Sequence, residues 1–368
     1  MIAIGVASLA IVLLALLYQV SHVLLLGFAG VLLGILLQAL AGLVTRLKQF
    51  STGMSLAAVA LVLAALLGGL VWFAGATLKS QADQFAKQLP RSFDQLATEA
   101  RDWPVVGAWL AIDDSESAGH PQTNDAAQLR ESIRSAAPKV ASTLSTVIGS
   151  LVGVASALVV VLVVGIYVAA TPLVYARGVV HLTPKSYRPR AREVIATLVY
   201  TLRHWLIGQG ITMLVIATMT GIGLYFIGVK LWLLLAILAG LFNFIPTLGP
   251  FISFVPAVLL AWSDDASLVP WVIGLYLVAQ SIEGYLLTPL VQRRAVDVPP
   301  ALLIIAQMTM ASLAGILGVM LAAPLTAVAI VIVRMLYVKD TLGDTTFAPA
   351  QDAAIQAMAA RIEHSHAD

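Results

Sequence analysis

The stretch LFNFIPTLGP, Leu241 to Pro250, lies in the middle of an apolar run that is too long for one membrane helix. The run from Leu231 to Trp262 has 32 residues and no charge, whereas about 20 helical residues cross a bilayer core of about 30 Å. Pro246 and Pro250 lack backbone N–H groups and disfavour helical geometry in the residues before them, while Gly249 permits positive φ. The sequence therefore predicts a helix that opens inside this run.

The charges on either side of the run indicate how its two halves are arranged. If the run crossed the membrane once, Asp264–Asp265 would be cytoplasmic and Arg293–Arg294 external, which inverts the positive-inside rule. We therefore expect the halves, 231–243 and 251–262, to form a re-entrant hairpin that enters and leaves on the same side.

The opened backbone is a candidate transport site. Irregular backbone at membrane depth is tolerated where protein or a water-filled cavity surrounds it. In transporters such breaks present free N–H and C=O groups to a substrate or ion. The alternative is a proline kink that binds nothing. The candidate path residues at the break are Asn243, Pro246, Thr247, Gly249 and Pro250.

The composition identifies the bilayer as the main surroundings of the chain. Of its 368 residues, 60% are apolar and 11% are charged, against roughly 45–50% and 25% in soluble globular proteins. This balance excludes a conventional soluble enzyme, a disordered chain and a nucleic-acid binder, which needs dense Lys and Arg. The absence of Cys excludes disulfides, thiolate nucleophiles and Cys-ligated metals.

Charge-free gaps between ionisable residues predict the membrane spans. The expected class is an all-α polytopic membrane protein with about eight transmembrane helices, the re-entrant hairpin and an external helical insertion. Lys and Arg in the short loops place both termini in the cytoplasm. The expected order is three transmembrane helices in 1–78, with a turn near Gln19 to His22; an external amphipathic helical hairpin in 79–144; a fourth transmembrane helix in 145–171; a basic cytoplasmic loop in 172–205; a C-terminal transport region in 206–337; and a cytoplasmic tail in 338–368.

The last apolar run, 300–337, again exceeds one span. Gly315–Gly318 divides it, so we expect either two crossings or a second re-entrant segment over 300–318. The two arrangements place the C-terminus on opposite sides, and two crossings agree with the cytoplasmic tail.

Glu283 is the acidic residue that lies well inside a predicted span, 268–289. A carboxylate there costs about 2.5–3.5 kcal/mol on insertion scales, so such groups are normally paired, protonated or exposed to water. Gln280 lies one turn earlier on the same face, and Gln209 is a weaker candidate for the same path. A structural contact or an interfacial position of Glu283 is the alternative.

Motifs of enzymes do not occur in the sequence. It has no G-x-x-x-x-G-K-[ST], no H-E-x-x-H and no G-x-S-x-G, so we expect no enzymatic activity, no cofactor and no metal site. His364 and His366 are expected to be solvated. Small-residue spacing at Gly27, Gly30 and Gly34 favours close helix approach and a homo-oligomer.

The stretch from Arg203 to Tyr337 resembles the AI-2E (autoinducer-2 exporter-like) transporter family. The resemblance rests on WLIGQ at 205–209, GLFNFIPTLGP at 240–250, Glu283 with Pro289, and GILG at 315–318 leading to Ala323-Pro324-Leu325. It implies a bacterial cytoplasmic-membrane protein with eight spans that acts as a secondary exporter. The family name refers to a small furanone signalling molecule, and members have also been linked to sodium–proton exchange. The family often has His-Pro after the Glu-bearing span, where this chain reads Val298-Pro299-Pro300.

The sequence therefore predicts a secondary transporter that exports a small polar organic solute by alternating access. A cation–proton antiporter that uses Glu283 is the alternative within transport. From another class, a non-transporting membrane scaffold would bind a partner through the 79–144 hairpin.

Overall fold

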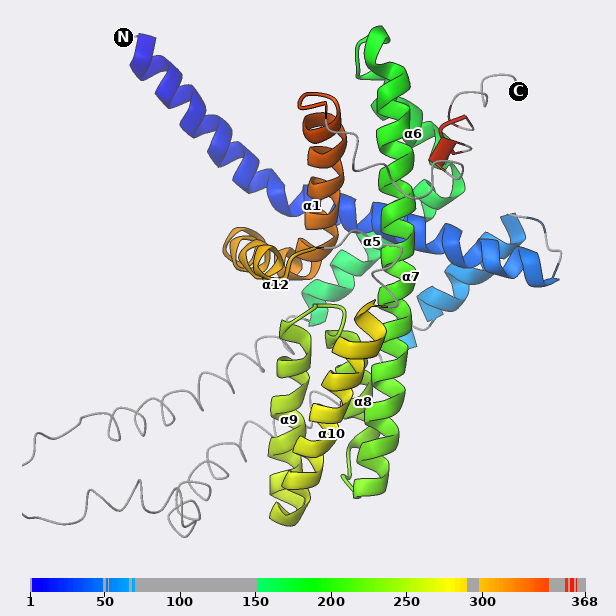
Figure 1. The fold of residues 1–368 in the computed structure, drawn as a ribbon, viewed down its shortest axis with the longest axis vertical. Coiled ribbons are helices and arrows are strands. Elements are labelled where there is room, and N and C mark those ends of the chain that lie inside the picture. Colours follow the sequence, from blue (N-terminus) through cyan, green and yellow to red (C-terminus); the bar gives the residue numbers. More distant parts are fainter. Residues whose placement is uncertain are drawn as a thin grey trace, which may run out of the picture.

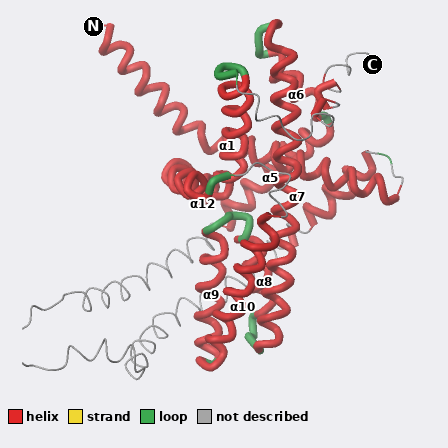
Figure 2. The backbone as a smooth tube through the Cα atoms, viewed as in Figure 1, coloured by secondary structure: helices red, strands yellow, loops and turns green. Residues whose placement is uncertain are grey.

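The described residues form helices joined by short loops, with no strand among them, as the composition predicts (Figure 2). Four of its helices are long and apolar enough to cross a membrane, or five if one pair bent by 87° counts as a single span. The predicted 79–144 insertion lies outside the described residues, so the total of about eight spans stays a prediction. The computed structural model describes residues 2–48, 51, 53–65, 68–69, 151–289 and 298–343, with 355–356, 358–360 and 362 near the C-terminus.

Helix α1 (Ile2–Lys48) is a single helix of 47 residues. The turn predicted near Gln19 to His22 is therefore wrong, because the backbone stays helical there. None of these four residues is Gly or Pro, and Gln, Ser, Val and His each cost a helix at most about 0.7 kcal/mol relative to Ala. Polar side chains alone do not open the backbone.

Helix α5 (Leu151–Ala170) packs along α1 through small residues. A Cβ atom at Gly30 would lie 2.5 Å from Cγ1 of Val164, and one at Gly34 would lie 2.8 Å from Cγ1 of Val168. The two helices therefore approach as closely as glycine allows. This part of the glycine spacing serves a contact within the chain, so it no longer supports the expected homo-oligomer.

The segment 172–205, expected to be a loop, is mainly helical. The chain turns by 87° after α5 into α6 (Pro172–His181), and a short 3-10 helix, η2 (Lys185–Tyr187), leads to α7 (Arg188–Ile227). Pro189 suits the first turn of a helix, where its missing N–H has no partner to lose. Arg, Ala, Glu and Leu then favour helix over the next turns. The basic residues of this segment therefore lie in a helix and not in a loop.

The C-terminal half is built around a bundle of four helices (Figure 1). They are α7, α8 (Trp232–Phe242), α9 (Leu248–Asp264) and α10 (Val269–Ile282), with η3 (Ala266–Leu268) joining the last two. Their apolar faces meet in a core that contains Leu224, Leu235, Ala257, Val272 and Tyr276.

Helices α8 and α9 form an antiparallel hairpin. Lys230 precedes α8 and Asp264 ends α9, and the Lys230 Nζ lies 2.7 Å from the Asp264 Oδ1. The two ends of the hairpin therefore lie together, at the same end of the bundle, as a re-entrant segment requires. Its position in a bilayer stays a prediction.

Helix α12 (Pro300–Ile332) contains the second interruption. Ala314 and Gly315 have non-helical backbone, and Gly315 has a φ of 58°, so the helix divides at the glycines that predicted it. Gly318 packs directly on the carbonyl oxygen of Met310. The two parts of α12 run in different directions (Figure 1). Whether the first part spans or re-enters the membrane stays a prediction.

Helices α10 and α12 each continue into a π-helix, η4 (Glu283–Leu287) and η5 (Val333–Lys339). A π-helix is rare and occurs often at functional sites. The first one begins at the carboxylate that the sequence singles out.

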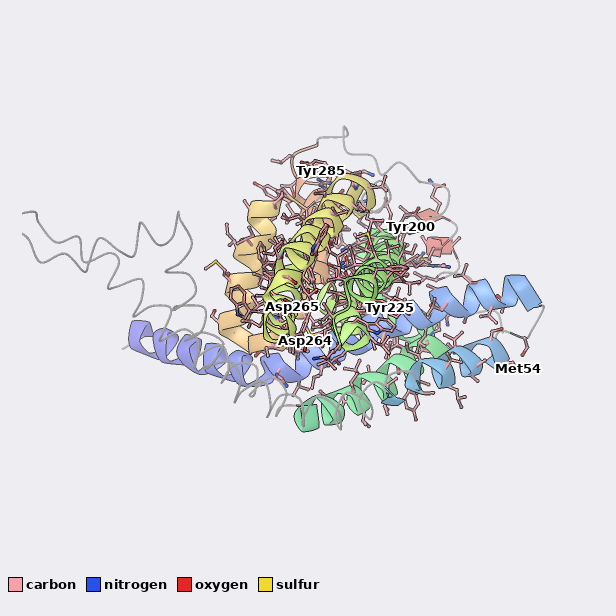
Figure 3. All side chains as sticks on the ribbon, turned by 90° about the horizontal axis from the view of Figure 1, so that it is seen from below. Met54, Tyr200, Tyr225, Asp264, Asp265 and Tyr285 are labelled. Atoms are coloured by element: carbon pink, nitrogen blue, oxygen red, sulfur yellow. The ribbon has the colours of Figure 1, made fainter. Side chains whose placement is uncertain are left out.

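Helix α1 runs across α7 and not alongside it. Figure 3 views the molecule along the vertical direction of Figure 1 and shows α7 end-on while α1 lies across the field. Leu32 and Ile35 of α1 pack there against Leu202 and Leu206 of α7 and Leu321 of α12. The two halves of the molecule thus share one apolar core.

An ion cluster joins the first turns of α7 to the end of η5. The Arg190 Nη2 lies 2.8 Å from the Asp340 Oδ1 and donates a hydrogen bond of 2.8 Å to the Met335 carbonyl. Arg190 also pairs with Glu193, whose other oxygen is 3.8 Å from the Lys339 Nζ. Burial disfavours the charged guanidinium, but its bonds to the two carboxylates outweigh that effect, so the pKa of Arg190 is raised.

Candidate transport site at the helix break

The hairpin tip, residues 243–247, connects α8 to α9 through a strained turn. The Leu248 N–H donates to the Pro246 carbonyl at 2.9 Å, and Thr247 between them has φ 73° and ψ −53°. These values describe a γ-turn of the rare kind with positive φ. For a β-branched residue such a conformation costs of order 1–3 kcal/mol. The surroundings of the tip must supply that energy.

Two glutamines hold the carbonyl groups that the break sets free. The Gln209 Nε2 of α7 donates to the Asn243 carbonyl at 2.6 Å. The Gln307 Nε2 of α12 donates to the Pro246 carbonyl at 2.7 Å, so that carbonyl accepts two hydrogen bonds. Both side chains are buried. The opened backbone is therefore satisfied by protein, which is the condition for irregular backbone at membrane depth.

Glycine is required where the two helices of the hairpin meet. A Cβ atom at Gly249 would collide with the carbonyl oxygen of Phe242, which belongs to the backbone and has little freedom to move. Gly240 packs in a similar way on α7, where a Cβ would lie 2.7 Å from the Ala217 Cβ. These contacts fix the hairpin against itself and against α7.

A small pocket lies beside the tip, between the hairpin, α7 and α10. Most of its lining residues are buried, whereas Gln280 is exposed. In this conformation the pocket has room for about one water molecule. The lining residues are Ile216, Thr220, Ala239, Asn243, Pro250, Ser253, Tyr276, Ala279, Gln280 and Glu283.

The structure thus brings four of the predicted path residues together. Asn243, Pro250, Gln280 and Glu283 line the pocket. The other four, Pro246, Thr247, Gly249 and Gln209, shape or hold the tip and do not line the pocket.

Asn243 is the most unusual residue of the pocket. It is 1% exposed, and neither its Oδ1 nor its Nδ2 has a hydrogen-bond partner among the described residues. The Glu283 carboxyl lines the same pocket and lies next to the side-chain amide. The buried hydroxyl of Thr220 is unpaired too, within the same part of the chain. Buried polar atoms without partners are rare and need an explanation such as a bound water, ion or ligand.

Glu283 lies where α10 changes into a π-helix. It is half-buried, and its own carbonyl accepts a hydrogen bond of 2.9 Å from the Thr288 hydroxyl. About two turns earlier, the Tyr276 hydroxyl donates to the Ser253 carbonyl at 3.2 Å and ties α10 to α9. The pocket therefore offers one carboxyl, two amides and several hydroxyls, a set that binds polar solutes, protons or small cations. Among the described residues, no three His, Asp or Glu side chains are grouped to hold a metal ion.

The sequence profile described as AI-2E family transporter matches residues 7–337, which include the hairpin, α10 and α12. The chain belongs to the AI-2E transporter family. This is the family that the residues between 203 and 337 resemble.

Relatives of this AI-2E chain carry names that refer to transport. "Putative transport protein YrrI" of Bacillus subtilis (strain 168) is 34% identical over 148 residues, which are 40% of this chain and 42% of the relative. "Putative transport protein YueF" of the same organism is 29% identical over 189 residues, 51% of each chain. The chain thus spans about half the length of these relatives. "Putative transport protein MT0215" of Mycobacterium tuberculosis (strain CDC 1551 / Oshkosh) is 29% identical over 265 residues, 72% of this chain and 69% of the relative.

Reasoning from sequence missed several site residues of this AI-2E transporter. Gln307 had a signal, because an amide in the apolar segment 300–315 is unusual. Thr220, Ser253 and Tyr276 had none, since hydroxyl residues are common in membrane helices and only the packing of α7, α9 and α10 brings them to one pocket.

Proposed function

We propose that this AI-2E transporter exports a small polar organic solute by alternating access, through the pocket beside the hairpin tip. The observation that carries the proposal is the buried Asn243 amide, unpaired within the described residues and next to Glu283. A solute with a hydroxyl or carbonyl group would satisfy the amide and the carboxyl at once. Gln280, which is exposed, would receive the solute first.

The described conformation corresponds to an occluded state in this proposal, because the pocket has room for about one water molecule. To admit a solute, α10 must separate from the hairpin. The Tyr276 to Ser253 bond is the polar contact that closes α10 on α9, so it would break as the pocket opens. Gln209 and Gln307 would keep the tip intact during that motion.

The size of the pocket favours a second candidate, a cation–proton antiporter. Its oxygen atoms come from Glu283, Asn243, Thr220 and Ser253, and oxygen is the ligand type that hard cations prefer. In this case Glu283 would bind a proton and a cation alternately. The observation that favours it is the room for a water-sized occupant without any helix movement.

Two assays on the same purified protein separate the candidates. Proteoliposomes loaded with a radiolabelled furanone of the family's signalling class should release it faster than empty-vector liposomes if an organic solute is exported. Everted vesicles should lose their pH gradient on addition of sodium if the chain is an antiporter. Solute flux that saturates supports export, and gradient collapse without solute flux supports antiport. The absence of both activities contradicts a transport path at this pocket for either substrate.

Variants then test the site. Glu283→Gln and Asn243→Ala should each lower the active flux at least tenfold. Ser281→Ala is the matched control on the same helix, because the Ser281 side chain is exposed and bonds only its own helix at the Leu277 carbonyl. Wild-type flux in folded Glu283→Gln protein would end the assignment of this site.

A further inference from the structure

Helix α6 has an outer face that is apolar and exposed. Val174 is 63% exposed, Val179 is 54% exposed and Leu182, just beyond the helix, is 86% exposed. Tyr175 lies on the same face, while Val180 on the opposite face is buried. The helix follows α5, which has no charged residue, and is bent from it by 87°. This pattern, with a tyrosine and exposed aliphatic side chains at the end of an apolar span, is typical of a membrane interface.

Arg177, the first charged residue after α5, has an unsatisfied guanidinium edge. The Arg177 Nε and Nη2 are shielded from solvent, and neither has a hydrogen-bond partner in the ranges that the structure describes. These two nitrogens form the side of the guanidinium that binds an oxyanion through two parallel N–H···O bonds. A buried charged donor without a partner is costly, so this edge points to a missing anion.

Three of the carboxylates that the structure describes form ion pairs with other cations. Near α6, Glu193 and Asp340 form the ion cluster with Arg190 and Lys339. Asp264 pairs with Lys230 at the far end of the bundle. None of the described carboxylates is bonded to the Nε or Nη2 of Arg177, so this edge can take an anion from outside the chain.

We propose that Arg177 binds the phosphate of an anionic phospholipid, with the acyl chains lying along the apolar face of α6. A lipid supplies both features of the site, because its phosphate fits the Nε–Nη2 edge and its chains cover Val174 and Val179. Gly178, next to Arg177, is exposed and has open space where a Cβ would be. A free phosphate would leave the apolar face uncovered.

The test compares lipids on the purified full chain in detergent. Phosphatidylglycerol should raise the melting temperature by several degrees more than phosphatidylcholine of the same acyl composition, because a ligand of the folded state stabilises it. Glycerol phosphate, which has the anionic group without acyl chains, should give less than half of that extra shift. Equal shifts with the two lipids, or a full shift with glycerol phosphate, would overturn the proposal.

Variants locate the effect. Arg177→Gln should abolish the difference between the two lipids, and Arg177→Lys, which keeps the charge but loses the bidentate edge, should retain less than half of it. Lys185→Gln is the control, since Lys185 is an exposed cation close in sequence, and it should keep most of the difference. If Arg177→Gln does not fold, the lysine variant and the comparison of lipids on the wild type still decide whether the site is specific. Equal losses in Arg177→Lys and Lys185→Gln would show general attraction and refute a specific site.

Discussion

Two buried side-chain amides of the site differ in whether they are hydrogen-bonded, and this difference separates a role in function from a role in stability. Gln209 donates to the Asn243 carbonyl, whereas the Asn243 side chain has no hydrogen bond among the described residues. Removing a bonded group leaves a buried partner unsatisfied, at a cost of about 1–3 kcal/mol, but removing an unpaired group leaves none. The contributions of the two residues to stability should therefore be unequal.

We predict that the free energy of unfolding of Asn243→Ala lies within about 1 kcal/mol of the wild-type value, while its transport is largely lost. Gln209→Ala should lower the free energy of unfolding by about 1–3 kcal/mol. Thermal unfolding in detergent and flux in proteoliposomes measure the two effects on the same preparations. A large loss of stability in Asn243→Ala would mean that the amide is a structural group and not a ligand for the solute.

Thr247 allows a test of the strained turn. Glycine reaches φ 73° without the steric cost that a β-branched residue has there, so Thr247→Gly should relax the tip. We expect the variant to be as stable as the wild type or more stable by about 1 kcal/mol, and to transport more slowly if the strain drives opening. Thr247→Val is the control that removes the hydroxyl and keeps the branched Cβ. Equally slow transport in the two variants would assign the role to the hydroxyl, which both lack, and contradict the prediction.

At the level of helices, the two interruptions have the same construction. In each, a glycine packs on a backbone carbonyl, Gly249 on Phe242 and Gly318 on Met310. Gln307, from the first part of α12, bonds the tip of the first interruption. The two broken elements are therefore in direct contact through this bond.

We predict that Gly249→Ala and Gly318→Ala each lower the free energy of unfolding by about 3 kcal/mol or more, because the new Cβ meets backbone atoms. Gly274→Ala in α10 is the matched control. No atom lies within 4 Å of its Cβ position, and alanine favours helix there by about 0.5–1 kcal/mol. Thermal unfolding of the three variants measures the contrast, and three equal melting temperatures would refute the close packing.

Sequence reasoning located the breaks because Pro and Gly act on the local backbone. Pro246 fixes its own φ, and Gly249 and Gly315 permit φ values that other residues disfavour, so both interruptions lie where they were expected. The turn near Gln19 failed because polar residues have no such local effect. The π-helix at Glu283 and the bond from Gln307 depend on tertiary packing, which one sequence without a known partner surface does not reveal.

At the scale of the whole molecule, an ion pair lies near each end of α7. Lys230 and Asp264 lie beyond its C-terminal end, and Arg190 and Asp340 lie at its N-terminal end. Figure 3 labels Asp264 and Asp265 together at the end of α9. The proposed orientation puts the first pair outside the cell and the second pair in the cytoplasm.

The chain has no native cysteine, so single-cysteine labelling can test this orientation directly. We predict that Asp265→Cys reacts with a membrane-impermeant maleimide in intact cells, whereas Lys185→Cys reacts only in everted vesicles. The reason is that a re-entrant hairpin returns Asp265 to the side of Lys230. Labelling of Asp265→Cys only in everted vesicles would mean that the run from 231 to 262 crosses the membrane once.

The ion cluster has a further consequence for the architecture of the chain. Residues 190 and 340 are bonded to each other although 150 positions separate them, so the segment between them begins and ends at one place. A segment with adjacent ends tolerates circular permutation, because a linker of a few residues joins the old termini. The transport half of this AI-2E protein could therefore be reopened at a surface loop and rejoined near Arg190 with its internal contacts unchanged.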